Sequence, residues 1–332
     1  MEEVEEGWDS LAVASGVVAV AFVLFMVRRW IKGGQFTEKV NAKGKVALVT
    51  GSNSGIGRQI VKELNLKGAK VYMLVRDIGR GNEAVRWMAK YGCDITRLFV
   101  RICDLNDFES VKKFVNDFDK EEDHVDILIN NAGCMFNPRY SATKDGYETV
   151  CQTNYLGHFL LTDLLLPKLE AAPAARVVNV SSKLHLRADT VDLDVMNKKS
   201  EYGVMKSYAR SKLASVLHAV EFTKRLRRRS SGTKVLINSC HPGAVNTDLV
   251  RIPFYRNVLK KVFGVFIWFF MKTDQDGAQT PLYCALSKKL EGVSGKYFAD
   301  CGEGEVHPFF YDADKAEVLY NQSLEYCKIE PQ

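Results

Sequence analysis

The chain has 332 residues, of which 46% are hydrophobic and 26% are charged, and its formal net charge at pH 7 is +6. This length and composition allow one large α/β core. The charge is modest, and the densest basic run, residues 225–229, falls where a predicted helix ends, so solvated cations are favoured over a nucleic-acid-binding patch. Eight cysteines without a Cys-x-x-Cys pair favour free thiols over disulfides, and no histidine has the spacing of a metal ligand.

The first 32 residues are predicted to form a membrane anchor. Residues 11–27 carry no charge, and a run of this length is the shortest that can span the hydrocarbon of a bilayer. Trp8 and Trp30 flank this run as interfacial residues do. An acidic start followed by cations after the apolar run is unlike a cleaved signal peptide. The positive-inside rule then places the following domain in the cytosol, with a buried core helix as the alternative. Residues 33–44 are expected to form a linker.

Short apolar runs alternate with helical patterns from residue 45 onward. Strands are predicted near 45–49, 70–75, 97–102, 126–130, 175–180, 234–239 and 295–299. Helices are predicted near 55–67, 79–91, 107–120, 145–170 with an irregularity at Gly157, 207–228 and 275–290. This alternation predicts a parallel sheet with helices on both faces. The carboxyl ends of the strands should meet at one edge, where ligands bind at the switch point.

A glycine-spaced turn follows the first predicted strand and opens directly into a helix. The turn reads Gly51-Ser52-Asn53-Ser54-Gly55-Ile56-Gly57, and Thr50 precedes it. Glycines allow a sharp turn here and let a pyrophosphate approach the backbone N–H groups at the helix N-terminus. The turn therefore predicts a dinucleotide site. Its Gly-x-x-x-Gly-x-Gly spacing resembles that of the short-chain dehydrogenase/reductase superfamily.

This resemblance implies an α/β fold with a doubly wound Rossmann-type parallel sheet. We expect a single catalytic domain over residues 45–300, an N-terminal membrane-anchor helix, and a C-terminal extension over 301–332. By the family pattern the cofactor also contacts positions after the later strands. These are Asp104, Leu105, Asn131, Ala132, Gly133, Pro242, Gly243, Val245 and Thr247.

Arg76 stands at the end of the second predicted strand, where an NAD enzyme usually offers an acidic residue to the ribose hydroxyls. A guanidinium there can bind a 2′-phosphate, so NADP(H) is favoured over NAD(H), and Asp77 next door keeps NAD(H) as the alternative. Arg58 is a second candidate for this positive charge, with a plain helix-surface role as its alternative.

The pattern Tyr-x-x-x-Lys, which puts a phenol and an ammonium on one helix face, occurs four times. The pairs are Tyr140/Lys144, Tyr202/Lys206, Tyr208/Lys212 and Tyr311/Lys315. The Tyr208 pair opens a long amphipathic helix, whereas Gly203 interrupts one rival and the other two lie in a loop and after the last strand. We therefore expect Tyr208 to be the general acid or base, with the Lys212 ammonium lowering the phenol pKa from about 10.

The family pattern supplies two further catalytic candidates. A serine at the end of the fifth strand donates to the substrate oxygen, and this position is matched by Ser182, with Ser181 as the alternative. In the family the lysine also holds the nicotinamide ribose, so Lys212 is expected to serve both catalysis and cofactor binding. Asn154 matches the fourth residue of the family's catalytic set, which supports a water relay behind the lysine.

Within the superfamily the chain most resembles the membrane-anchored retinol dehydrogenases. The resemblance is carried by the anchor, by a long insert between Val-Asn-Val-Ser-Ser and Tyr208, and by the late Ser-Gly-Lys-Tyr-Phe at 294–298. The lysine-flanked run 262–271, within a predicted loop over 251–273, suits a helix in the headgroup region, with a core helix or homo-oligomer contact as the alternative.

These features predict an NADP(H)-dependent enzyme that interconverts retinol and retinal on the cytosolic face of the endoplasmic reticulum or of a lipid droplet. A steroid or a fatty aldehyde or ketone is the alternative substrate. A catalytically silent membrane or lipid-droplet scaffold is the alternative from another class, and the complete catalytic set argues against it.

Overall fold

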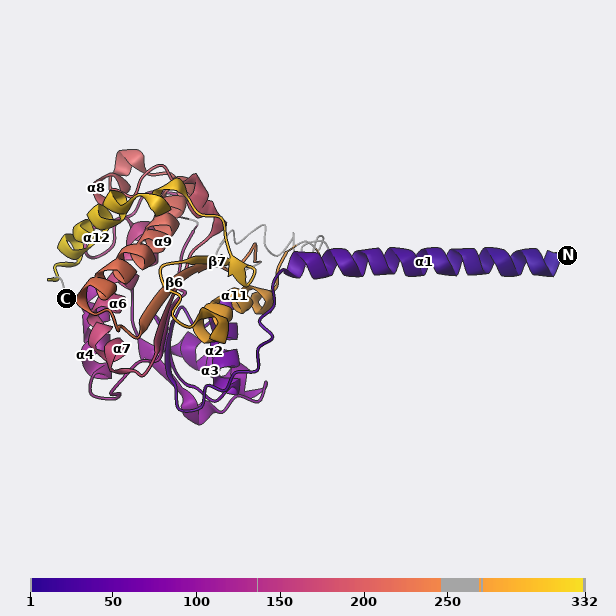
Figure 1. Ribbon diagram of the computed structural model, residues 1–332, viewed down its shortest axis with the longest axis horizontal. Coiled ribbons are helices and arrows are strands. Elements are labelled where there is room, and N and C mark those ends of the chain that lie inside the picture. The colour runs from indigo at the N-terminus through magenta and orange to yellow at the C-terminus, as the bar shows by residue number, and fades with distance from the viewer. Residues whose placement is uncertain (1, 136, 246–268, 270, 331–332) are drawn as a thin grey trace.

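The computed structural model describes residues 2–135, 137–245, 269 and 271–330, and side chains from residue 14 onward (Figure 1). Its centre is an eight-stranded sheet in the order β3-β2-β1-β4-β5-β6-β7-β8, parallel except for the antiparallel pair β7 and β8. The strands are β1 (Val46–Thr50), β2 (Lys70–Val75), β3 (Leu98–Ile102), β4 (Ile127–Asn130), β5 (Ala175–Val180), β6 (Val235–His241), β7 (Tyr297–Ala299) and β8 (Gly302–Glu303).

Helices cover both faces of this sheet, because each central strand is apolar on both sides. In β1, Val46 and Leu48 belong to one buried cluster and Ala47 and Val49 to the other. The first cluster includes side chains of α4 (Phe108–Phe118), α6 (Gly157–Leu164), α7 (Leu166–Ala171), α9 (Val204–Arg229) and α12 (Ala313–Cys327). The second includes side chains of α2 (Gly55–Leu66), α3 (Ile78–Ala89) and α11 (Asp274–Leu286). The doubly wound α/β fold predicted from the sequence is confirmed.

The predicted elements agree with the structure except at four places. The strand β8 and the helix α12 were not predicted. The helix predicted over 145–170 is divided into α5 (Thr149–Cys151), a π-helical turn over Gln152–Leu156, α6 and α7. The irregularity expected at Gly157 is thus a π-turn that ends there. A short helix, α8 (Leu193–Met196), lies in the insert before α9.

The N-terminal helix α1 (Glu2–Lys32) projects from the domain (Figure 1). Its described large apolar side chains from Val17 to Val27 are all exposed, which contradicts a buried core helix. Residues Ala14–Lys32 have a mean hydropathy of 1.7 and are long enough to cross a bilayer. The helix therefore fits a membrane anchor. Most of the apolar run predicted over 262–271 lies outside the described residues.

Candidate active site

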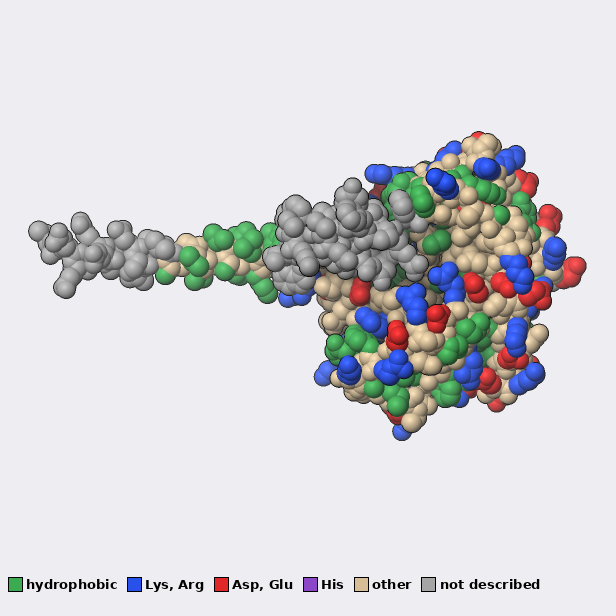
Figure 2. All heavy atoms as spheres, turned by 180° about the vertical axis from the view of Figure 1, so that it is seen from behind, with side chains coloured by type: hydrophobic (Ala, Val, Ile, Leu, Met, Phe, Trp, Pro, Cys, Tyr) green, Lys and Arg blue, Asp and Glu red, His purple; other side chains and the backbone are tan. Residues whose placement is uncertain are grey.

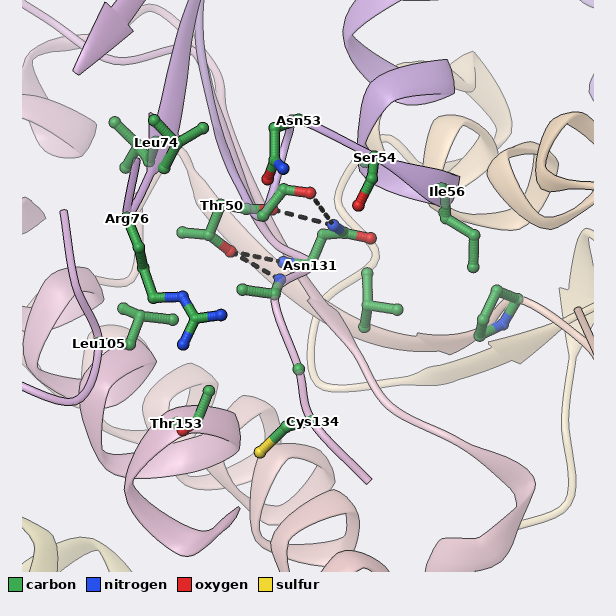
Figure 3. Close-up of a pocket in the computed structure, with 18 of the residues that line it drawn as sticks. Thr50, Asn53, Ser54, Ile56, Leu74, Arg76, Leu105, Asn131, Cys134 and Thr153 are labelled. Carbon is green, nitrogen blue, oxygen red and sulfur yellow. Dashed lines mark hydrogen bonds between the residues drawn. The ribbon is translucent and has the colours of Figure 1, made fainter. Parts of the chain in front are cut away.

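A cavity of about 500 Å³ opens at the carboxyl edge of the sheet, where the strand order reverses between β1 and β4. This is the switch point at which doubly wound sheets bind ligands. Figure 3 shows side chains around it from β1, from β2 and from the loops after β1, β2 and β4. Most residues predicted from the sequence line this cavity. They are Gly51, Asn53, Ser54, Gly55, Ile56, Gly57, Arg76, Asp104, Leu105, Asn131, Ala132, Gly133, Ser182, Tyr208, Lys212, Pro242, Gly243 and Val245.

The glycine-rich turn packs too closely for side chains at two positions. A Cβ on Gly57 would lie 2.4 Å from the carbonyl oxygen of Gly51, and Gly51 itself has φ of +63°. Ser54, the N-cap of α2, makes no side-chain capping bond, and the first turn of α2 has no acidic residue. Free N–H groups at the start of a helix attract an anion. The turn therefore fits the phosphates of a dinucleotide.

Thr50 and Asn131 join β1 to β4 beneath the cavity (Figure 3). The Thr50 hydroxyl accepts hydrogen bonds from the backbone N–H groups of Asn131 and Ala132, both at 2.9 Å, and lies 2.8 Å from His158 Nε2. The Asn131 side chain donates to the Thr50 carbonyl at 2.9 Å. Burial lowers the pKa of His158 to about 3, so its ring is neutral. These bonds hold the cavity floor rigid.

Two arginines face the cavity at its β2 end. Arg76 follows β2, and Arg80 lies in the first turn of α3. The Asp77 carboxylate caps α3 by accepting from the Arg80 N–H at 3.1 Å. Arg58, the other candidate, is turned away, because its guanidinium lies 3.9 Å from the centre of the Trp87 ring. Arg80, which the sequence analysis missed, is therefore the second cation that lines the cavity beside Arg76.

Tyr208, Lys212 and Ser182 converge at the other end of the cavity, the first two from α9 and the serine from the end of β5. The Lys212 ammonium lies 5.6 Å from the centre of the Tyr208 ring and donates to the Val180 carbonyl at 2.8 Å. Burial lowers the pKa of Lys212 to about 8. Burial also raises the pKa of Tyr208 to about 12, although a hydrogen bond with Ser182 lowers it.

This electrostatic balance differs from the sequence argument, in which the ammonium lowers the pKa of the phenol. In the structure the desolvation of Tyr208 has the larger effect on the pKa, and its hydroxyl is protonated at neutral pH. The two serines are also distinguished. Ser181 donates its hydroxyl to the Lys212 carbonyl at 2.7 Å, whereas Ser182 lies beside the Tyr208 hydroxyl.

Asn154 lies in the π-turn just behind the cavity wall. Its side-chain oxygen accepts from the Cys134 N–H at 2.8 Å, and its amide donates to the Cys134 carbonyl at 2.9 Å and to Ser211 Oγ at 3.0 Å. A Cβ on Gly133 would lie 3.3 Å from Asn154 Oδ1 and 3.4 Å from Lys212 Nζ. The Asn154 side chain thus joins the loop after β4 to α9.

The rival Tyr-x-x-x-Lys pairs are placed elsewhere. The Tyr140 hydroxyl donates to the Asn197 carbonyl at 3.1 Å, the Tyr202 hydroxyl donates to the Asn137 carbonyl, and Tyr311 is 79% exposed. Among the described residues, Tyr208 is the tyrosine that lines the cavity.

Three predicted positions are not part of the cavity lining described. Ser52 is buried and donates to the Leu74 carbonyl, Asn154 acts from behind the wall, and Thr247 lies outside the described residues. Cys134, Asn106 and Thr153 line the cavity but were not predicted, because they belong to no recognised motif and only the folded chain brings them together.

Comparison with known proteins relates this geometry to a family. Residues 45–253 match the family model described as short chain dehydrogenase. Human (Homo sapiens) retinol dehydrogenase 12 is 42% identical, with 90% of this chain and 91% of that protein covered. Human retinol dehydrogenase 14 is 40% identical, with 95% and 94% covered, and retinol dehydrogenase 11 of Mus musculus is 41% identical, with 86% and 88% covered.

Solved structures share the fold. The crystal structure of an uncharacterized protein from Mycobacterium paratuberculosis superposes with a TM-score of 0.71 and 31% identity, covering 90% of this chain and all of that one. A short chain dehydrogenase from Escherichia coli CFT073, complexed with NADPH, gives a TM-score of 0.59 at 20% identity, covering 78% and 97%. The family match and these relatives agree with the sheet, the glycine-rich turn and the Tyr208–Lys212 pair. The chain therefore belongs to the short-chain dehydrogenase family of nicotinamide-dependent oxidoreductases and, within it, to the group of the retinol dehydrogenases.

Proposed function

We propose that this protein is an NADP(H)-dependent oxidoreductase that interconverts a membrane-borne hydrophobic alcohol and its carbonyl, with retinol and retinal as the preferred pair. The observation that carries the proposal is the convergence of one phenol, one ammonium and one serine hydroxyl on the cavity that also receives the glycine-rich turn. Each of the other three tyrosine–lysine pairs lacks this placement. Names of relatives support the choice of a retinoid.

NADP(H) is proposed over NAD(H) because of charge at the β2 end of the cavity. Arg76 and Arg80 both line it. The Asp77 carboxylate lines it as well, with one oxygen accepting from the Arg80 N–H as the cap of α3. A pair of guanidiniums suits a 2′-phosphate, whose oxygens accept charge-assisted hydrogen bonds.

Lys212 is proposed to hold the nicotinamide ribose. An ammonium has three donors, and the bond to the Val180 carbonyl uses one. The remaining capacity suits ribose hydroxyls beside Gly133, where a side chain would crowd the ammonium. When bound, the cofactor exchanges a hydride with the substrate carbon.

The proton step is assigned to Tyr208. With a pKa of about 12 the phenol holds its proton at neutral pH and can donate it to the carbonyl oxygen during reduction. Ser182, within hydrogen-bond reach of the phenol, is placed to orient the same oxygen. The positive charge of Lys212 favours the phenolate that forms as the proton leaves. In oxidation the same groups act in reverse.

The proposed location is a membrane of the endoplasmic reticulum or a lipid droplet, with α1 as a single span and the catalytic domain in the cytosol. The exposed apolar surface of α1 supports the span, and the basic residues in its last turn support the orientation. Steroids and fatty aldehydes remain the competing substrates, because the described cavity lining names no particular lipid.

The catalytic assignment can be tested with a matched pair of variants, Tyr208→Phe and Tyr202→Phe. Membrane fractions are assayed with retinal, a steroid ketone and a fatty aldehyde, each with NADPH and NADH. Loss of the proton donor should lower turnover by roughly a hundredfold to ten-thousandfold in Tyr208→Phe, while cofactor binding persists. Tyr202→Phe should stay active. Inactivation by the Tyr202 change alone would refute the assignment, and a higher kcat/KM for the steroid or fatty aldehyde would refute the retinoid.

A further inference from the structure

The membrane helix does not end in a free tether. Near its C-terminal end lies Arg28, which is 7% exposed although Val27 before it and Trp30 after it face outward. The Arg28 guanidinium donates to the carbonyl of Met271 at 3.1 Å and to that of Phe269 at 3.4 Å. It also lies 3.6 Å from the carboxylate of Asp276, which belongs to the capping box of α11. A buried, directional ion pair of this kind fixes one geometry, because a displaced charge would lose its partners inside the fold.

The segment after α1 is packed against the domain along its length. Gly33 and Gly34 lie on the turn after β7, where a Cβ on Gly34 would be 1.7 Å from the carbonyl oxygen of Asp300. The Phe36 N–H donates to Gln279 Oε1 at 3.1 Å, and the Glu38 carboxylate accepts from the Lys288 N–H at 3.0 Å. This region, predicted as a linker, is a docked strap in the structure.

Lys272 connects this docking to the cavity. Its N–H donates to the Ala244 carbonyl at 3.0 Å, and its ammonium pairs with Asp300. Its side chain covers Gly243, where a Cβ would lie 2.4 Å from Lys272 Cδ. Gly243 and Val245 line the cavity on either side of Ala244. Met271, whose carbonyl accepts from Arg28 of α1, is therefore adjacent in the chain to Lys272, whose side chain packs on the cavity wall.

We propose that Arg28 and the strap 33–38 fix the membrane span to the Pro242–Val245 end of the cavity, so that a lipid-dissolved substrate enters from the bilayer without passing through water. The inference rests on the proposed function for the nature of the substrate. The apolar surface of α1 continues to Val27, so the hydrocarbon boundary lies within about one helical turn, roughly 5 Å, of the docking contacts. Figure 1 shows α1 leaving the domain beside α11 and β7.

Figure 2 shows from the opposite side the apolar side chains that α1 exposes outside the domain. In this arrangement Arg28 is a positioning residue, because it touches the anchor's docking site and not the cavity. If the strap were flexible, the cavity could take any orientation relative to the membrane. The docked strap restricts the cavity to one orientation.

A matched pair of variants tests the docking. Arg28→Gln and Arg29→Gln remove the same charge from the same helix end, but Arg29 is exposed. Hydrogen exchange is measured on the full chain in phosphatidylcholine vesicles. Loss of a charged hydrogen bond should make the amides of residues 33–36 and 271–277 exchange roughly tenfold to a hundredfold faster in Arg28→Gln, with no change in Arg29→Gln. Unchanged exchange in Arg28→Gln would overturn the proposal.

Kinetics then separate positioning from general stability. The KM of Arg28→Gln for vesicle-borne retinal should rise by about tenfold at constant kcat, while the KM for a short water-soluble aldehyde stays within about twofold. Equal losses for both aldehydes would show a merely structural role and overturn the access claim. Gly34→Ala, which breaks the strap at a second point, should reproduce the split if Arg28→Gln fails to fold. Absence of turnover by the wild type with both aldehydes would refute the proposed function and with it the access claim, while the exchange rates still decide whether Arg28 holds the anchor.

Discussion

Replacing Lys212 by methionine should make the protein more stable and inactive at the same time. Lys212 is 4% exposed, and burial lowers the pKa of its ammonium from 10.5 to about 8. A tenfold change in proton affinity is worth roughly 1.4 kcal/mol, so holding this charge in the fold costs about 3 kcal/mol at pH 7. The variant also loses the charged bond to Val180, worth about 1.5 kcal/mol. The net gain in the free energy of unfolding is therefore about 1.5 kcal/mol.

The pH dependence of this difference has a definite sign. Below pH 8 the folded and unfolded chains both carry the proton on Lys212, and the cost is complete. Between about pH 8 and 10.5 the unfolded chain keeps the proton after the folded chain has lost it. The unfolding free energy of the wild type therefore rises with pH in this interval relative to that of Lys212→Met, and the gap between the two proteins narrows.

The assay is thermal and urea denaturation in detergent without cofactor, combined with turnover of retinal and NADPH. We expect a higher Tm for Lys212→Met by roughly 2–4 °C at pH 7 and loss of turnover. Lys206→Met, on the same helix but half exposed and paired with Glu201, serves as the control and should not gain stability. A less stable Lys212→Met variant at pH 7, or a stability gap that is constant from pH 8 to 10.5, would refute the reasoning.

Two further predictions concern the cofactor and the membrane. Arg76→Ala should weaken NADPH binding by about tenfold to a hundredfold and NADH binding much less, since a charged hydrogen bond contributes roughly 1.5–3 kcal/mol, whereas Arg58→Ala should leave the ratio unchanged. Titration by fluorescence measures both, and equal losses for the two cofactors contradict the 2′-phosphate assignment. Protease added to sealed microsomes should digest the catalytic domain, and removing residues 1–32 should lower membrane association but preserve cofactor binding. Protection of the domain in intact vesicles would show that the orientation inferred from the charges is wrong.

The local signals in this sequence were sufficient wherever structure depends on neighbours in the chain. The seven parallel strands could be predicted because each is an apolar run bounded by turn residues. The irregularity at Gly157 was also visible, since a glycine interrupts a helical pattern. In the structure a Cβ there would lie 2.7 Å from Leu105, so the glycine lets a cavity-lining residue approach the helix.

The signals failed where a side chain chooses between two directions. Arg58 was the candidate beside the dinucleotide turn and Arg80 was missed, and only the position of Trp87 shows that Arg58 points away. The linker over 33–44 has a loop-like composition, and its docking depends on Asp300 and Gln279, which are more than 240 residues away. Similarly, α12 packs on α9 through contacts that no local pattern specifies.

Helix α12 determines how the protein responds to truncation of its C-terminus. Its buried face includes Leu319, Tyr320 and Leu324, and Ser323 Oγ lies 2.7 Å from the hydroxyl of Tyr155, the residue after Asn154. A stop codon just after Asp312 would leave every motif of the dinucleotide and proton-transfer sites in place. It would nevertheless uncover apolar surface on α9 and leave the Tyr155 hydroxyl without its partner. Alleles truncated there should therefore behave as loss-of-function alleles, because cellular quality control removes the polypeptide before its intact active site can be used.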